Sequence, residues 1–357
     1  MADRKLRVLV VDDSAINRKS LTGLLEEHPG VQVIGTASDG DEALRLAASL
    51  SPDLITLDLE MPRMDGFTFL RLLMASRPTP VIVVSSHSAK ENVFRALELG
   101  AIDFIAKPEQ LLAGRTEEIR TQLDHMVAVV RQLAPSTWRT RRKPVPSEPP
   151  GRAKTTIQER PLSKLGGSPD KLVVVASSTG GPTALLELFS KLPSRASASI
   201  VVAQHMPDRF TKAFADRLDR LSAFRVLEAD DKHEINAGTA LVCPGGRCIE
   251  VSRNNGRLTA QVVWPGEQDR YAPSADRLFS SSAKAAGRRV IGVVLTGMGD
   301  DGARGVVEVA ESGGTVIAES EETAVVFGMP KAAARTGMVN HVLPLTGLVD
   351  KLVKLLA

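Results

Sequence analysis

The chain has 357 residues, more than one ordinary hydrophobic core holds, so we expect two domains. Its formal net charge of +3 at pH 7 is too small to indicate nucleic-acid binding by itself, and no apolar run is long enough to span a bilayer. The apolar run near the start ends in two aspartates, unlike that of a signal peptide. Cys243 and Cys248, the only cysteines, fit no common zinc spacing, which favours a reducing, cytoplasmic location.

Residues 1–133 alternate short apolar segments with helical patterns. We expect strands at 7–11, 31–37, 54–57, 81–84 and 104–106, and helices at 17–27, 41–50, 67–75, 91–99 and 110–133. Five such units with nearly continuous apolar strands predict a parallel sheet covered on both faces, a doubly wound α/β domain.

Residues 134–170 have a different composition, rich in proline and arginine and without apolar periodicity. This pattern predicts a linker that is semi-rigid where proline is dense. Its basic residues are interpreted as a solvated segment rather than as a nucleic-acid contact.

Residues 171–357 predict a second doubly wound, Rossmann-like α/β domain. Strands are expected at 173–176, 200–203, 225–228, 240–243, 290–295 and 315–318, and helices at 183–191, 209–221, 274–286, 303–311, 330–335 and 345–356. Between them, the Asn254-Asn255-Gly256 turn joins two apolar runs and predicts a β-hairpin inserted at 245–263.

Polar residues directly follow the predicted strands of the first domain: Asp12, Asp13, Asp58, Ser85 and Lys107. The carboxyl ends of parallel strands meet at one edge of a sheet, so the aspartates should cluster there. Clustered carboxylates repel one another unless a cation lies among them, and Mg²⁺ prefers such ligands. A helix cap or a turn would explain one aspartate, but not the whole set.

These segments carry a resemblance. VLVVDDS, PDLITLDLEMPRMDG, PVIVVSS and FIAKP resemble a two-component response-regulator receiver domain over about residues 5–130. The resemblance implies a flavodoxin-like fold with strand order 2-1-3-4-5, phosphorylation of Asp58, and support of the phosphoryl group by Ser85 and Lys107. It places Mg²⁺ at Asp12, Asp13, Asp58 and the Glu60 carbonyl.

Three residues follow predicted strands of the second domain in the same way. They are Ser178 in SSTGG, His205 in AQHMP and Asp301 in GMGDDG. The serine turn alone suits either a phosphate cradle or a nucleophile. A hydroxyl, an imidazole and a carboxylate at one sheet edge favour acyl transfer, although each taken singly has a structural explanation as a turn residue, a core histidine or a cap.

The stretch from Gly297 to Gly302 also has the form G-x-G-x-x-G, and Glu319 lies where a dinucleotide fold places its ribose-binding acid. Asp300 and Asp301 would repel a pyrophosphate in that loop, so the dinucleotide alternative is weak. The same glycines suit an oxyanion hole around Met298.

A second resemblance covers about residues 170–357. VASSTGGPTAL, AQHMPDRFTKAFADRL, YAPSADRLF, VVLTGMGDDGA and FGMPKAA resemble the catalytic domain of the CheB family of chemotaxis protein-glutamate methylesterases. It implies that Ser178 is the nucleophile, His205 the base and Asp301 its orienting acid. Thr179 and Met298 would line the site, Met298 donating its backbone N–H. Ala176-Ser177 and Cys248 depart from the family's common residues.

The two resemblances together imply a phosphorylation-activated serine hydrolase with no cofactor for the esterase chemistry. It would remove glutamyl methyl esters from methyl-accepting chemotaxis receptors and also deamidate receptor glutamines. A histidine kinase would supply the phosphoryl group. The enzyme would act on membrane receptors without being a membrane protein, and nucleic acid is not an expected partner. The alternative is a response regulator whose second domain is a non-catalytic binding module.

Overall fold

The chain forms two compact units, Met1–Pro150 and Gly151–Ala357. The structure, a computed structural model, describes residues 4–85, 90–106, 116–133, 167–193 and 197–356. Within those ranges, no helix is both long and apolar enough to cross a membrane.

The first unit contains a five-stranded sheet with the order β2-β1-β3-β4-β5. Its strands are β1 (Leu6–Val11), β2 (Val31–Ala37), β3 (Leu54–Leu57), β4 (Val81–Ser85) and β5 (Asp103–Ala106). All neighbouring strands are parallel, which confirms the predicted doubly wound, flavodoxin-like order.

Helices connect these strands: α1 (Ala15–Glu26), α2 (Gly40–Leu50), α3 (Gly66–Ser76), α4 (Lys90–Leu99) and α5 (Thr116–Gln132). Side-chain oxygens of Ser14, Asp39 and Asp65 accept backbone N–H bonds at the starts of α1, α2 and α3, so capping residues set these boundaries. Leucines of α1 share a core with apolar residues of α5, which places both helices on one face of the sheet. The predicted Lys107 lies outside the described residues, as does residue range 134–166 of the predicted linker.

The second unit contains a seven-stranded parallel sheet with the order β15-β14-β13-β6-β7-β10-β8. Its strands are β6 (Lys171–Ser177), β7 (Ala198–Gln204), β8 (Arg225–Glu228), β10 (Thr239–Val242), β13 (Val290–Val294), β14 (Thr315–Glu319) and β15 (His341–Leu343). From β6 the chain first continues to β7 on one side and later to β13 on the other. The strand order therefore reverses between β6 and β13, and open α/β sheets bind ligands at such a point.

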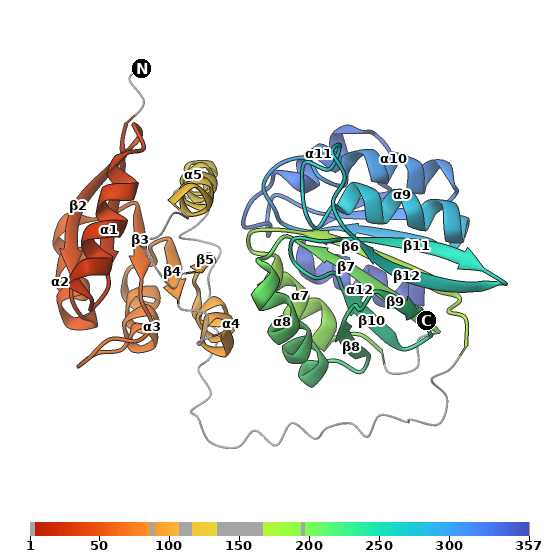
Figure 1. Ribbon diagram of the computed structural model, residues 1–357, viewed down its shortest axis with the longest axis horizontal. Coiled ribbons are helices and arrows are strands. Elements are labelled where there is room, and N and C mark those ends of the chain that lie inside the picture. Colours follow the sequence, from red (N-terminus) through yellow and green to blue (C-terminus); the bar gives the residue numbers. More distant parts are fainter. Residues whose placement is uncertain (1–3, 86–89, 107–115, 134–166, 194–196, 357) are drawn as a thin grey trace. The chain divides into compact units, whose positions relative to one another are not determined.

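Helices cover both faces of this sheet (Figure 1): α9, α10 and α11 on one face, α7, α8 and α12 on the other. Their bounds are α7 (Gly181–Ser190), α8 (Asp208–Leu221), α9 (Ala275–Ala286), α10 (Ala303–Glu311), α11 (Met329–Arg335) and α12 (Leu345–Leu356), with a short 3-10 turn, η2 (Gly287–Arg289), after α9. The central strands are buried almost completely, as two covered faces require.

The predicted hairpin is present as β11 (Cys248–Asn254) and β12 (Arg257–Val263), paired in antiparallel fashion. Asn255 and Gly256 turn the chain with φ of 50° and 81°, as an Asn-Gly hairpin turn requires. A third strand, β9 (Lys232–Glu234), pairs with β12 and was not predicted. Its three residues are polar and largely exposed, so the sequence shows no alternation there. The strand β15, also three residues long, was not predicted either.

Candidate active site

The three polar residues that follow strands of the second sheet lie at one edge. Ser178 follows β6, His205 follows β7 and Asp301 lies in the loop after β13. These strands are adjacent in the order β13-β6-β7, and the register pairs Ser177 with Gln204. Ser178 and His205 therefore leave the sheet at the same level, on neighbouring strands.

A tight, buried turn follows Ser178. Gly180 has a φ of 78°, a conformation that glycine adopts without strain, and Pro182 stands in the first turn of α7. The Ser178 N–H donates to the Thr296 carbonyl at 3.0 Å, and the Gly181 N–H donates to the Ser178 carbonyl at 2.8 Å. The predicted strand, turn and helix are thus present, and the turn is attached to the loop after β13.

A hydrogen bond of 2.8 Å joins His205 Nε2 to Asp301 Oδ2. Asp301 is 2% exposed and also accepts the backbone N–H bonds of Ala275 at 2.7 Å and Asp276 at 3.0 Å. Burial alone would raise the pKa of this carboxyl, but the His205 hydrogen bond and charge and the two N–H groups together hold its pKa below the ordinary 3.8. Asp301 therefore carries its negative charge at neutral pH.

The same contacts assign the two nitrogens of His205. A carboxylate only accepts hydrogen bonds, so the neutral imidazole carries its proton on Nε2, facing Asp301. Nδ1 is then the basic nitrogen. This arrangement suits proton removal from a neighbouring hydroxyl, with Asp301 stabilising the imidazolium that forms. Asp301 does serve as a helix cap, but for α9 and not for the helix that follows it.

Ser177, the serine adjacent to the candidate nucleophile, is fully buried. Its hydroxyl donates to Gln204 Oε1 at 2.6 Å. The Gln204 amide nitrogen in turn donates to the carbonyls of Ser178 at 3.0 Å and His205 at 2.9 Å. Gln204 thus links the two loops. Sequence reasoning missed this residue, although its position as the last residue of β7, directly before His205, was visible.

The loop after β13 passes directly against the serine turn. A Cβ at Gly297 would lie 2.8 Å from the Ser178 Cβ, and the Thr296 hydroxyl donates to the Thr179 carbonyl at 2.9 Å. Thr179 is buried, and Met298, the residue after Gly297, is half-buried. Thr179 therefore belongs to the serine turn, and Met298 belongs to the loop that packs against it.

Glu319 has a role other than the one the dinucleotide alternative assigns to it. It is 1% exposed, and its carboxylate accepts the Thr296 N–H at 2.8 Å and the Thr323 hydroxyl at 2.9 Å. Asp300 stands in the same glycine loop, beside Arg270 at 3.4 Å. Because the Glu319 carboxylate is already bound within the domain, the arrangement does not support ribose binding.

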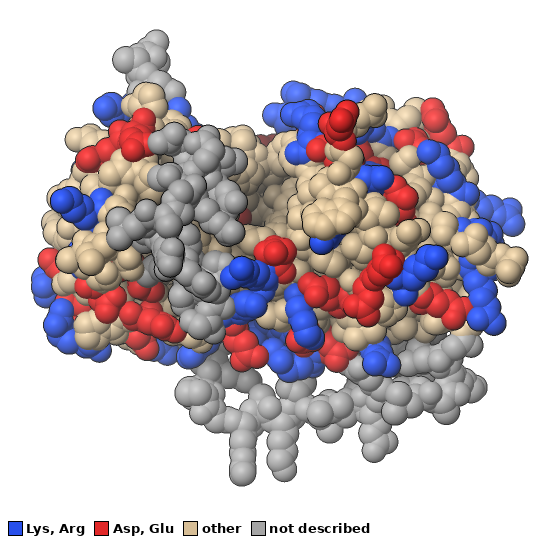
Figure 2. Space-filling view, viewed as in Figure 1, with Lys and Arg blue, Asp and Glu red and all other residues tan. Residues whose placement is uncertain are grey.

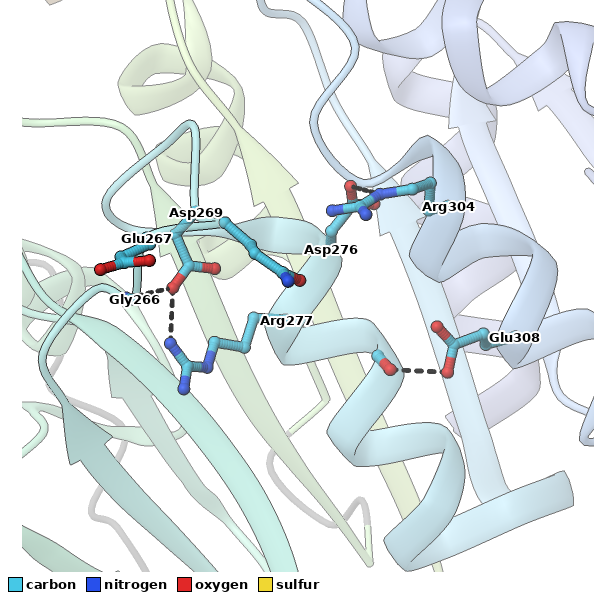
Figure 3. A pocket seen from close by; sticks show the side chains of 9 residues that line it. Gly266, Glu267, Asp269, Asp276, Arg277, Arg304 and Glu308 are labelled. Carbon is cyan, nitrogen blue, oxygen red and sulfur yellow. Dashed lines mark hydrogen bonds and ion pairs between the residues drawn. The ribbon is translucent and has the colours of Figure 1, made fainter.

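A polar hollow lies between α9, α10 and the loop before α9 (Figure 3). Its charged groups pair with one another: Arg277 with Asp269 at 2.5 Å and Arg304 with Asp276 at 2.9 Å. Asp269 Oδ2 also accepts the Gly266 N–H at 2.7 Å. These contacts hold the loop against α9. Basic and acidic side chains are similarly mixed over much of the face seen in Figure 2.

The first unit brings together the three predicted aspartates. One carboxylate oxygen each of Asp12, Asp13 and Asp58 lies within 4.8 Å of the others. Asp12 and Asp58 are buried, whereas Asp13 is exposed. Three like charges so close favour a bound cation, and an all-oxygen donor set fits Mg²⁺.

The other predicted residues of this site are placed only in part. The Glu60 N–H donates to Asp58 Oδ1 at 3.3 Å, so residue 60 stands beside the central carboxylate. Ser85 ends β4, next to β3, and is buried. Both positions agree with the expected strand edge.

Comparisons with known proteins give a consistent result. A family model described as CheB methylesterase matches residues 173–352, and one described as response regulator receiver domain matches residues 8–115. The chain is 45% identical to protein-glutamate methylesterase/protein-glutamine glutaminase 3 of Geobacter sulfurreducens, over 98% of this chain and 97% of that protein. It is 48% identical to protein-glutamate methylesterase/protein-glutamine glutaminase 6 of Anaeromyxobacter dehalogenans, over 98% of this chain and 96% of that protein.

The crystal structure of the Thermotoga maritima CheB methylesterase catalytic domain is similar to the second unit. Its TM-score is 0.50 at 40% identity, and the match covers 52% of this chain and 98% of that one. These relatives are named as enzymes, which disfavours a non-catalytic second domain. The chain therefore belongs to the CheB methylesterase family, with a receiver domain preceding the esterase domain.

Proposed function

We propose that this protein is a phosphorylation-activated serine esterase. It hydrolyses glutamyl methyl esters on methyl-accepting chemotaxis receptors, releases methanol, and deamidates receptor glutamines at the same site. The names of its relatives support this substrate class. The observation that carries the proposal is the 2.8 Å hydrogen bond between His205 and the buried Asp301, beside the loop of Ser178.

In the first half-reaction the Ser178 Oγ attacks the ester carbonyl while His205 Nδ1 takes its proton. Asp301 holds the imidazolium through Nε2. Backbone N–H groups of the glycine loop, with that of Met298 first among them, bind the developing oxyanion. A single donor of this kind contributes roughly 10²–10³-fold in kcat in serine hydrolases.

In the second half-reaction His205 has protonated the departing methanol and next activates a water molecule. That water attacks the acyl-enzyme, leaving glutamate on the receptor and restoring the Ser178 hydroxyl. A glutamine side chain follows the same path with ammonia as the leaving group. Thr179 lines the site through its backbone.

The receiver domain supplies control. Asp58 accepts a phosphoryl group from a histidine kinase, and the carboxylates of Asp12, Asp13 and Asp58 with the Glu60 carbonyl would hold Mg²⁺. Bound Mg²⁺ would neutralise charge as the phosphoryl group is transferred. Ser85 and Lys107 would bind the transferred group.

The test is methanol release from methylated receptor membranes by wild type, Ser178→Ala and Ser177→Ala. Ser178→Ala should lose essentially all activity, because the imidazole then has no hydroxyl to activate. Ser177→Ala is the matched control: it should keep most activity and lose about 1 kcal/mol of stability, since it removes only the hydrogen bond to Gln204. Full activity of Ser178→Ala would refute the assignment of the nucleophile.

A further inference from the structure

A single tyrosine, the only one in the chain, lies on the candidate base. The ring of Tyr271 stacks on the imidazole of His205, with centroids 5.1 Å apart and planes within 7° of parallel. Tyr271 belongs to the loop before α9, which is remote in sequence from His205. A parallel contact of this kind covers one face of the imidazole and restricts rotation of its ring.

Tyr271 is itself held at two points, its hydroxyl and its backbone carbonyl. Its hydroxyl donates to Asp300 Oδ1 at 3.1 Å, and its backbone carbonyl faces the buried Cys248 thiol at 4.0 Å. A Cβ at Gly299 would lie 2.6 Å from the Tyr271 hydroxyl oxygen, so only glycine leaves room for the ring there. Burial and the Asp300 contact raise the pKa of Tyr271, so the phenol stays neutral and remains a hydrogen-bond donor.

The loop that carries Tyr271 is fixed to the helix that holds Asp301. Asp269 binds Arg277 of α9, as Figure 3 shows, and Ser274 caps the same helix. The first N–H groups of α9 bind Asp301. One helix therefore anchors both the acid at Nε2 of His205 and the aromatic ring on its face.

We propose that Tyr271 is a positioning residue for His205. By stacking on the imidazole it keeps Nε2 on Asp301 and Nδ1 toward Ser178, and it shields one face of the ring from water. This role rests on the proposed function, because it concerns the base of that reaction. Tyr271 neither gains nor loses a proton: the serine proton passes to Nδ1 and then to the methanol oxygen. The electron-rich face of the phenol also favours the transient imidazolium.

The alternative is that Tyr271, which is half-buried, contacts the receptor substrate and not the base. Separate values of kcat and KM distinguish the two roles. A residue that positions the base changes kcat, whereas a residue that only binds substrate changes KM.

The experiment measures methanol release by the full chain carrying Tyr271→Phe, Tyr271→Leu or Tyr271→Ala. We expect Tyr271→Leu and Tyr271→Ala to lower kcat about tenfold, as loss of an aromatic stack and a misplaced base imply, with KM within about twofold. Tyr271→Phe keeps the ring and should retain kcat within about threefold. Trp264→Ala is the matched control: this aromatic residue lies nearby in sequence, is 71% exposed and should leave both constants unchanged.

Three results would overturn the proposal: a raised KM with unchanged kcat, unchanged kinetics in Tyr271→Leu, or a Phe variant as slow as the Leu variant. Folding of each variant is checked by circular dichroism, and the Phe–Leu pair keeps the test informative if the Ala variant is unstable. Failure of the proposed function has a different signature, namely activity that survives Ser178→Ala in the same assay.

Discussion

The carboxyl ends of the strands carry differently arranged charges in the two sheets. At the edge of the first sheet, three carboxylates lie within 4.8 Å of one another, and Asp13 is open to solvent. At the edge of the second, one carboxylate is 2% exposed and accepts three hydrogen bonds, one of them from an imidazole. In each of the two parallel sheets, polar side chains gather at the carboxyl ends of the strands. The charges among these side chains determine which chemistry each site suits.

The two sites therefore differ in the groups that they need from outside their own domain. The three carboxylates of the first sheet repel one another, so a bound cation would stabilise this site. In the second domain, two backbone N–H groups and a histidine of the same domain stabilise the negative charge of Asp301. The first site therefore suits the proposed signalling input, and the second suits the proposed hydrolysis.

Asp301→Asn tests the second edge most severely. An amide cannot stabilise the imidazolium as a carboxylate does, and it favours the wrong tautomer, so kcat should fall about 10³–10⁴-fold. The neighbouring Asp300→Asn provides the control. Its side chain is 57% exposed and an amide oxygen still accepts the Tyr271 hydrogen bond, so kcat should change less than about threefold. Equal losses in the two variants would contradict the assignment of Asp301.

Asp58→Asn tests whether the first edge controls the second. We expect it to abolish the increase in methanol release caused by a small phosphodonor with Mg²⁺, while activity without the donor persists. Asp65→Asn, which keeps a capping side chain at the start of α3, should leave the response intact. An unchanged response in Asp58→Asn would mean that phosphorylation occurs elsewhere.

Asp13→Asn should have opposite effects on stability with and without the cation. Without Mg²⁺, removing one of three repelling charges should raise the free energy of unfolding of the receiver by about 1 kcal/mol. With saturating Mg²⁺ the wild type should be the more stable form, because it binds the ion more tightly. Thermal unfolding of both proteins, once with EDTA and once with Mg²⁺, gives the sign of the stability difference in each condition. The same sign in both buffers would show that the cluster is not a cation site.

The stability contribution of Asp301 in the second domain should depend on pH. The folded pKa of Asp301 lies below 3.8, so its contribution is present above that value and is lost as pH falls through the folded pKa. The stability advantage of wild type over Asp301→Asn should therefore shrink below about pH 4. Hydrogen exchange of amides in β6 and β13 measures it within the catalytic unit. A loss already at about pH 6 would point to another group.

Much of the fold and of both sites was predictable, because the residues that follow parallel strands in the sequence come together at the carboxyl ends of those strands. The parallel strands, their two-sided burial and the polar residues just beyond them predicted both α/β folds and the grouping of Ser178, His205 and Asp301. The same rule predicted the aspartate cluster. The strands β9 and β15 were not predicted, because three residues are too few to show a clear alternation.

What the sequence did not predict depends on contacts between remote segments. Nothing near Gln204 indicates that its amide joins two loop carbonyls, and nothing near Tyr271 indicates a histidine partner 66 positions earlier, the difference between residue numbers 271 and 205. Ser177 was known only as a neighbour of the candidate nucleophile, and its hydrogen bond to Gln204 gives it a structural role. The catalytic roles themselves remain predictions for the variants above.

The hydrogen bonds between Asp301 and the first two backbone N–H groups of α9 should make esterase activity depend on the docking of that helix. The acid that orients His205 is held by a helix formed from a different part of the chain. In a chain in which α9 has not docked, Asp301 lacks these two hydrogen bonds, so we expect the proposed base to be unoriented and esters to stay intact. Hydrolytic competence recovered during refolding should therefore rise together with amide protection at Ala275 and Asp276, and not before it.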